Sequence, residues 1–169
     1  MPHALTELKL NAVTKPAHVR PQEIRADVCV VGAGIAGLSA AIESARLGRD
    51  VVLVDALPVI GGQMVHSLIG LFCGVFGNAP GYPQLTHGVF DDIFRELGAT
   101  GDLHFQRGHT TTVFYNEVAL GRWLETTIGS LGVRTILGTV LQHVDIRDGR
   151  IRSVSLASTN PVALTETFP

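Results

Sequence analysis

The stretch DVCVVGAGIAGLSAAIESARLGRDVVLVD runs from Asp27 to Asp55 and indicates the fold class of the chain. Its first apolar run, residues 27–31, is bounded by a glycine and is typical of a buried strand. Apolar residues then recur at helical spacing as far as Gly48, a residue type that often follows a helix end. A second β-branched run, residues 51–54, comes next. Two such strands around a helix favour a βαβ unit with a parallel sheet.

The turn between the first strand and the helix reads G-x-G-x-x-G, with Gly32, Gly34 and Gly37. In this pattern the first glycine permits the tight turn, the second lets a pyrophosphate approach the backbone, and the third lets the helix pack on the strand. The helix N-terminus offers free N–H groups and partial positive charge to phosphates. Asp55 ends the second strand, where a carboxylate can accept hydrogen bonds from ribose hydroxyls. The stretch therefore predicts dinucleotide binding.

Residues 56–86 differ in character, because they are rich in glycine and proline and show no helical or strand period. Loops this long within compact domains are usually functional or disordered. The apolar segment LIGLFCGVF argues against disorder, so we expect it to pack against a ligand or another chain.

The later elements have clear boundary signals. Asn116 suits a helix N-cap, Gly132 suits the end of that helix, and Asp148-Gly149 is typical of a hairpin turn. We predict, in chain order, a helix over 89–97 ending at Gly98, a strand over 110–115, a helix from Asn116 to Gly132, a strand over 133–137, and a hairpin around Asp148-Gly149. The expected domain is 26–157, flanked by tails at 1–25 and 158–169.

Composition narrows the functional classes. The 169 residues carry a net charge of −2 without a basic block, so we expect no nucleic-acid partner. Two cysteines cannot build a disulfide scaffold, and we expect a reducing, cytoplasmic setting and no metal site. No apolar run has the length of a membrane span or a secretory signal, so neither is predicted.

Over residues 26–157 the sequence resembles FAD-dependent oxidoreductases with a glutathione-reductase-type flavin domain, in particular the amine and hydroxyl dehydrogenase-like branch. The resemblance is carried by DVCVVGAGIAGLSAA, by Asp55, by the doublet Gly61-Gly62, by GLFCG, and by YNEVALGRWLETTIGSLGVRTILGTVLQHVDIRDGRI. It implies FAD as cofactor, with the doublet near the flavin phosphates or ribityl chain and the backbone at Leu141 beside the adenine. The residues expected at the cofactor are Gly32, Gly34, Ile35, Ala36, Gly37, Asp55, Ala56, Gly61, Gly62, Gln63, Met64 and Leu141.

The sequence departs from this family in two respects. The acid at position 55 is an aspartate where glutamate is more common, a chemically equivalent change. We also find neither the late Gly-Asp motif nor the substrate domain of the family. The expected fold is thus an α/β, Rossmann-like parallel sheet with helices and an added antiparallel hairpin, incomplete without a partner chain. The partner would be a larger subunit that supplies the missing parts, and truncation and a self-sufficient small protein are the alternatives.

The function expected from this resemblance is oxidation of a C–N or C–O bond in a small metabolite by hydride transfer to FAD. The alternatives are an NAD(P)-binding module of a reductase and a non-catalytic assembly subunit. His66 is a candidate proton acceptor, and Cys73 a candidate redox residue. Cys29, within the first strand, is expected in the core. Tyr82 and Arg107 are candidates for contact with the partner chain.

Overall fold

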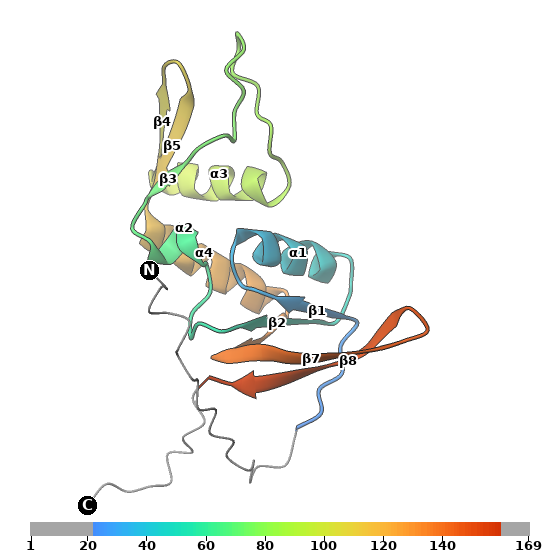
Figure 1. Cartoon of the computed structure of the whole chain (residues 1–169). Helices are drawn as coiled ribbons and strands as arrows, with labels where there is room; N and C mark the ends of the chain where they lie inside the picture. The colour runs from blue at the N-terminus through green and yellow to red at the C-terminus, as the bar shows by residue number, and fades with distance from the viewer. Residues whose placement is uncertain (1–21, 160–169) are drawn as a thin grey trace, which may run out of the picture.

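The computed structural model describes residues 22–159, which fold into two lobes on a shared core (Figure 1). The lower lobe holds a parallel sheet, its helices and a β-hairpin, and the upper lobe holds a small antiparallel sheet, one helix and a long loop. The predicted tails at 1–21 and 160–169 lie outside the described residues.

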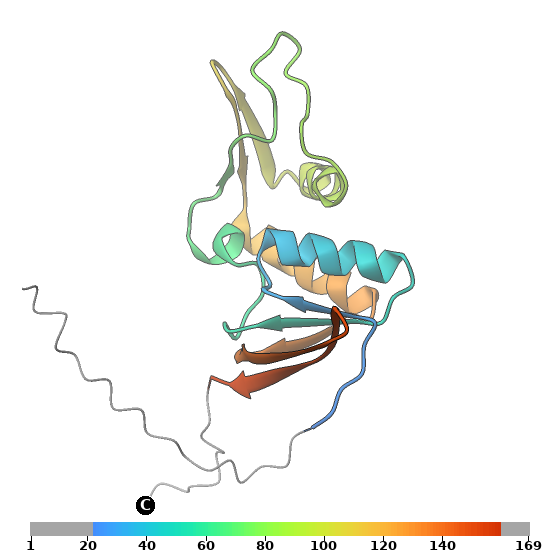
Figure 2. The same cartoon turned by 45° about the vertical axis from the view of Figure 1, so that its right-hand side comes forward.

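The sheet of the lower lobe has the order β1-β2-β6, and all three strands are parallel. The strands are β1 (Val28–Val31), β2 (Val51–Asp55) and β6 (Arg134–Leu137). Helices α1 (Ile35–Arg46) and α4 (Glu117–Ser130) cover one face, and the hairpin of β7 (Thr139–Arg147) and β8 (Arg150–Ser158) lies on the other side (Figures 1 and 2). The predicted parallel sheet, helices and added hairpin are confirmed.

The upper lobe has an antiparallel sheet in the order β3-β5-β4. It contains β3 (Leu71–Phe72), α3 (Val89–Thr100), β4 (Leu103–Arg107) and β5 (Thr111–Tyr115), and the short helix α2 (Gln63–His66) precedes it. Strand β4 escaped prediction, because its sequence LHFQR is short, carries polar residues and is mostly exposed.

One continuous hydrophobic core joins the lobes. In the lower lobe Leu38, Ile42 and Leu53 are fully buried between α1 and the sheet. In the upper lobe Phe72 stacks on Tyr115 with ring centroids 4.0 Å apart. The expectation that LIGLFCGVF packs against a ligand or another chain is therefore wrong for Phe72, which is buried inside this chain's own core.

Helix and turn ends mostly follow the predicted signals. Asn116 caps α4, because its side-chain oxygen accepts hydrogen bonds from the N–H groups of Val118 (3.1 Å) and Ala119 (3.3 Å). Asp148 and Gly149 both have positive φ, as a two-residue hairpin turn requires. The predicted end of α3 at Gly98 is wrong: α3 continues to Thr100, and Gly101 supplies the left-handed C-cap.

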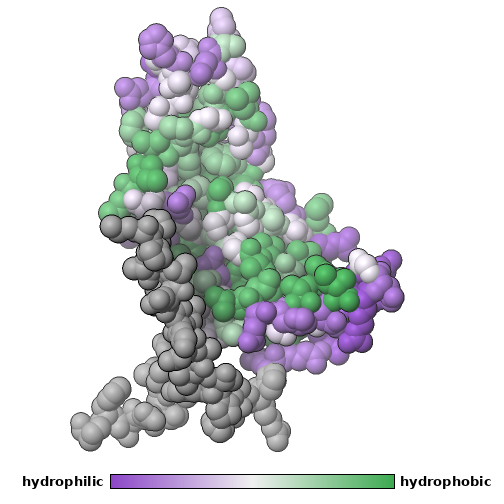
Figure 3. Space-filling model, viewed as in Figure 1, coloured by the Kyte–Doolittle hydropathy of each residue, from purple (hydrophilic) through white to green (hydrophobic). Residues whose placement is uncertain are grey.

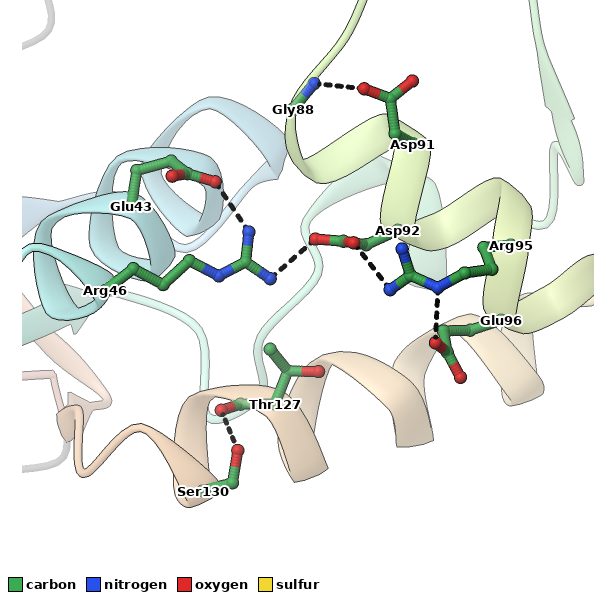
Figure 4. Close-up of polar contacts among 9 residues, drawn as sticks. All are labelled: Glu43, Arg46, Gly88, Asp91, Asp92, Arg95, Glu96, Thr127 and Ser130. Carbon is green, nitrogen blue, oxygen red and sulfur yellow. Dashed lines mark hydrogen bonds and ion pairs between the residues drawn. The ribbon is translucent and has the colours of Figure 1, made fainter.

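Charged side chains connect the two lobes above this core (Figure 4). Arg46 of α1 donates a hydrogen bond of 2.6 Å to Asp92 of α3, and Arg95 donates one of 2.7 Å to the same carboxylate. Partial burial would raise the pKa of Asp92, but the hydrogen bonds and charges of the two arginines outweigh it and lower the pKa.

The face of β1 that points away from α1 is open. Cys29 is exposed and Val31 is 50% exposed on this face. The expectation that Cys29 lies in the core is therefore wrong, although partial burial still raises the pKa of its thiol. Figure 3 shows hydrophobic surface gathered on this side of the lower lobe. Among residues 22–159, no helix has the length and apolarity needed to cross a membrane.

Candidate nucleotide-binding site

The glycine turn after β1 is held in place by backbone contacts. Gly32 has a φ of +107° and donates its N–H to the carbonyl of Val54 over 2.7 Å. A Cβ added at Gly37 would lie 1.7 Å from the carbonyl oxygen of Gly32. The positive φ of Gly32 and the close packing at Gly37 therefore explain these two glycines.

Gly34 has a different reason to be glycine. Its φ of −77° is accessible to any residue, and no protein atom lies within 4 Å of an added Cβ. The space in question belongs to a cavity of about 420 Å³. The cavity is lined by Val31, Gly32, Gly34, Ile35, Ala36, Gly37, Gln63 and Met64. A side chain at position 34 would fill a space that a ligand can occupy.

The N-terminus of α1 opens into the same cavity with its backbone donors available. The first intrahelical hydrogen bond runs from the N–H of Leu38 to the carbonyl of Gly34 over 2.9 Å. The preceding N–H groups of α1 have no side-chain cap among the described residues, and no acidic residue lies in the first turn. Such a terminus binds anions such as a pyrophosphate.

The second glycine motif closes the cavity from the other side. The N–H of Gly61 donates to the carbonyl of Ala33 over 2.8 Å. A Cβ added at Gly62 would lie 2.9 Å from the Cα of Gly34, and Gly62 has a φ of +53°. The doublet therefore lies against the first motif, and the structure brings Gln63 and Met64 to the cavity wall.

A tyrosine from the upper lobe fixes this wall. The Tyr115 hydroxyl donates a hydrogen bond of 2.8 Å to the carbonyl of Met64. Burial, helped by the charge of Glu117, raises the pKa of Tyr115 and keeps the hydroxyl a donor. Sequence reasoning missed this contact, because it joins residues 51 positions apart.

Asp55 accepts hydrogen bonds from two backbone N–H groups. One carboxylate oxygen accepts the N–H of Ala33 at 2.5 Å, and the other accepts the N–H of Leu57 at 2.7 Å. A carboxylate offers about four lone-pair sites, so acceptor capacity remains for ribose hydroxyls. Asp55 thus stabilises the glycine turn through its hydrogen bond to Ala33, a role that the sequence did not predict. The adjoining Ala56 is exposed.

Six predicted residues do not line the cavity: Asp55, Ala56, Gly61, Gly62, His66 and Leu141. Leu141 lies on β7 and is 41% exposed. Just before β7, the N–H of Gly138 donates a hydrogen bond of 3.1 Å to the carbonyl of Leu57, two residues after β2. His66 ends α2, and its Nε2 is 2.7 Å from the carbonyl of Ile60. That hydrogen bond ties the His66 side chain to the turn formed by residues 60–66. The role of His66 as proton acceptor stays a prediction.

Comparison with known proteins identifies the family. Residues 27–165 match the model of the family described as FAD dependent oxidoreductase. The zeta-carotene desaturase of Zea mays is 30% identical over 156 residues, which cover 89% of this chain and 24% of that protein. The probable fumarate reductase Ifc3 of Shewanella frigidimarina is 36% identical over 103 residues, 59% of this chain and 16% of that protein. The chain thus spans about a quarter or less of the length of these relatives.

Solved structures share the fold at low sequence identity. THI4 of Thermovibrio ammonificans superposes with a TM-score of 0.56 at 18% identity, over 79% of this chain and 47% of that one. A 3-ketosteroid dehydrogenase of Rhodococcus jostii gives a TM-score of 0.55 at 20% identity, over 83% of this chain and 44% of that one. The cavity described above fits the cofactor of the matched family. The N-terminus of α1 opens into it without a side-chain cap, and Gly34 leaves the space in front of that terminus empty. The chain belongs to the FAD dependent oxidoreductase family.

Proposed function

We propose that the chain is the small FAD-binding subunit of a heteromeric oxidoreductase that oxidises a C–N or C–O bond of a small metabolite. The observation that carries the proposal is the open space at Gly34, in front of the uncapped N-terminus of α1. When bound, FAD supplies two-electron chemistry by accepting a hydride.

The chain's own residues would bind and orient the cofactor. The N–H groups of Ile35, Ala36 and Gly37 are the candidate donors to the pyrophosphate. Asp55 would accept hydrogen bonds from the ribose, and Gln63 and Met64 would border the remaining part of the cofactor. Ala56 and Leu141 would lie toward the adenine, and His66 is the candidate proton acceptor.

The proposed partner is a larger subunit that covers the open face of β1 and supplies the substrate domain. In support, Cys29 is exposed on that face, and Ile146 and Ile151 of the hairpin are 60% and 68% exposed. Exposed apolar surface of this kind is typical of interaction sites. Both cysteines are free thiols, which suits a reducing, cytoplasmic setting.

The test is to purify the full chain with its natural companions and to measure bound FAD by absorbance and mass spectrometry. Gly34→Val should abolish FAD retention and leave folding intact, because a Cβ at this position meets no protein atom within 4 Å. Gly98→Val is the matched control, since its added Cβ also meets nothing within 4 Å but lies on α3. FAD retained by Gly34→Val would refute the site, and a flavin-loaded chain that stays alone would refute the partner.

A further inference from the structure

Leu68 lies in the turn between α2 and β3 and combines two unfavourable features. Its side chain is 86% exposed, and its backbone has a φ of +56°, in the left-handed region that bulky side chains rarely adopt. Its neighbour Ile69 is 53% exposed as well. Glycine or asparagine would suit such a position better. Strained residues of this kind are typical of functional segments, so we call residues 67–70 the Leu68 turn and ask what would cover it.

The Leu68 turn leads into an uncovered face of the upper antiparallel sheet. Residues paired across neighbouring strands point to the same face of a sheet. The pairs Leu71–Phe114, His104–Phe114 and Gln106–Thr112 therefore share one face, which we call the outer face. The opposite face is buried and packs on α3 through Phe72. Figure 2 shows α3 and the long loop on that side of the sheet, and no described element on the outer side.

The same surface adjoins the wall of the nucleotide cavity. Met64 of α2 lines that cavity, and α2 ends two residues before Leu68. Tyr115, which follows Phe114 on β5, donates its hydroxyl to the carbonyl of Met64 over 2.8 Å. A partner bound at the Leu68 turn would therefore contact the segment that forms the cavity wall.

The composition of this surface favours a protein partner. Neither the Leu68 turn nor the outer face contains a lysine, arginine, aspartate or glutamate. Cores of protein interfaces are poor in charged residues and often contain aromatic ones, as Phe114 is here. Nucleic acids and anionic lipid surfaces attract lysine and arginine, which this surface lacks.

The relatives indicate which protein would cover it. This chain covers 24% of the Zea mays desaturase and 47% of the THI4 chain, so more than half of each relative's length lies outside the part that this chain spans. A companion that supplies such a length, with the substrate site, has to reach the flavin, because the substrate meets the cofactor there. The Leu68 turn lies beside the cavity for that cofactor.

We propose that the Leu68 turn and the outer face dock the larger subunit, with Leu68 inserted in an apolar pocket of that subunit. This inference rests on the proposed function and adds a second contact surface, on the upper lobe, to the open face of β1. The left-handed turn presents the side chain in one conformation before binding, which lowers the entropy lost on association.

The first experiment compares the full-length wild type with Leu68→Asn in the complex with the natural companion. Asparagine tolerates the left-handed conformation and removes the apolar side chain. Leu68→Asn should weaken association at least tenfold, measured by titration calorimetry, and leave the melting temperature of the free chain unchanged or higher. A leucine that served only the fold would lower that melting temperature when replaced. Leu47→Asn is the matched control, because Leu47 is 78% exposed with a φ of −80° at the end of α1.

A second readout measures which side chains the companion covers. Hydroxyl-radical footprinting with mass spectrometry should show that Leu68, Ile69 and Phe114 are oxidised in the free chain and protected in the complex. Leu47 should be oxidised equally in both. The companion counts only if its sequence matches the part of the family relatives that this chain does not span.

The outcomes separate this inference from the proposed function. A wild-type chain that binds FAD but no companion would refute both. Equal association of wild type and Leu68→Asn, or equal oxidation of Leu68 in the free chain and the complex, would overturn this inference alone. Self-association of the chain, or binding to phosphatidylcholine vesicles, that Leu68→Asn abolishes would assign the surface to a second copy or to lipid, and either result would also overturn it.

Discussion

The two lobes of the molecule are built by different means. In the lower lobe a local motif of a strand, a glycine turn and a helix shapes the nucleotide cavity within a few residues. In the upper lobe a second cavity, of about 400 Å³, lies between the loop of residues 73–88 and the hairpin of β4 and β5, which aromatic contacts of Phe76, Phe94 and Phe105 connect. The difference shows that one cavity rests on backbone conformation and the other on side-chain packing, so different substitutions should destroy each.

The largest effect is expected from Phe72→Ala, which targets the upper lobe. Phe72 is 7% exposed and contacts the rings of Phe90, Phe94 and Tyr115. Removing it should lower the free energy of unfolding by about 3–5 kcal/mol, measured by urea denaturation. Phe114→Ala is the control, because Phe114 lies on the same sheet but is 38% exposed, and its loss should cost much less. Similar losses from both would show that the cluster is not a packed core.

Gly37→Ala should disrupt the glycine turn of the lower lobe. The added Cβ would lie 1.7 Å from the Gly32 carbonyl oxygen, so the turn must shift. We expect a loss of about 1–3 kcal/mol in the free energy of unfolding, and a loss of FAD binding. Gly98→Ala, on the open surface of α3, should be neutral or stabilising. A Gly37→Ala chain that binds FAD normally would contradict the packing argument.

Asn116→Ala tests the joint where β5 of the upper lobe leads into α4 of the lower lobe. The substitution removes the two hydrogen bonds that cap α4 and should cost about 1 kcal/mol in thermal or urea unfolding. Asn116→Ser should restore part of the lost stability, because serine also caps helices and, unlike aspartate, adds no charge beside Asp102, whose carboxylate accepts a 2.8 Å hydrogen bond from the Asn116 amide. An equally unstable Asn116→Ser chain would mean that the lost bond to Asp102, and not the lost cap, is the cause.

The smallest effect concerns the contact between α1 and α3. Because the folded-state pKa of Asp92 lies below its usual value of 3.8, the carboxylate stabilises the fold above that value, and its contribution is lost as the pH falls through the folded pKa. Asp92→Asn should therefore lower the unfolding free energy by about 0.5–1 kcal/mol at neutral pH, an amount reduced by the exposure of Arg46. The difference from wild type should vanish in strong acid, and a difference that persists there would exclude this cause.

The sequence predicts the lower lobe well because its signals are local. The spacing of Gly32, Gly34 and Gly37, the N-cap at Asn116 and the turn at Asp148-Gly149 each need only a few neighbouring residues to be interpreted. In the upper lobe the sequence predicts only α3 and β5, and not how they assemble with the other elements. Its strand β4 depends on pairing with β5, and the cavity at Thr111 depends on a loop that begins 38 residues earlier, at Cys73.

Within the nucleotide site the same distinction holds. The pattern identifies most of the residues that meet at the cavity, where the structure brings Gly32 and residues 34–37 together with Gln63 and Met64, and it misses Val31. The brace from Asp55 to Ala33 and the Tyr115–Met64 hydrogen bond have no sequence signature, because each depends on the distance between folded elements. The exposure of Cys29 was likewise unpredictable, since a β-branched run does not reveal whether its second face is covered.

The contact between Gly62 and Gly34 has a consequence for evolution. A methyl group at position 62 would come within 2.9 Å of the Cα of Gly34, an atom that any residue at position 34 has, so position 62 can change only if the first turn moves. In an alignment of homologues, bulkier residues at the doublet should coevolve with a remodelled first turn. The glycine turn at 32–37 and the doublet Gly61-Gly62, although far apart along the chain, would then change together or not at all.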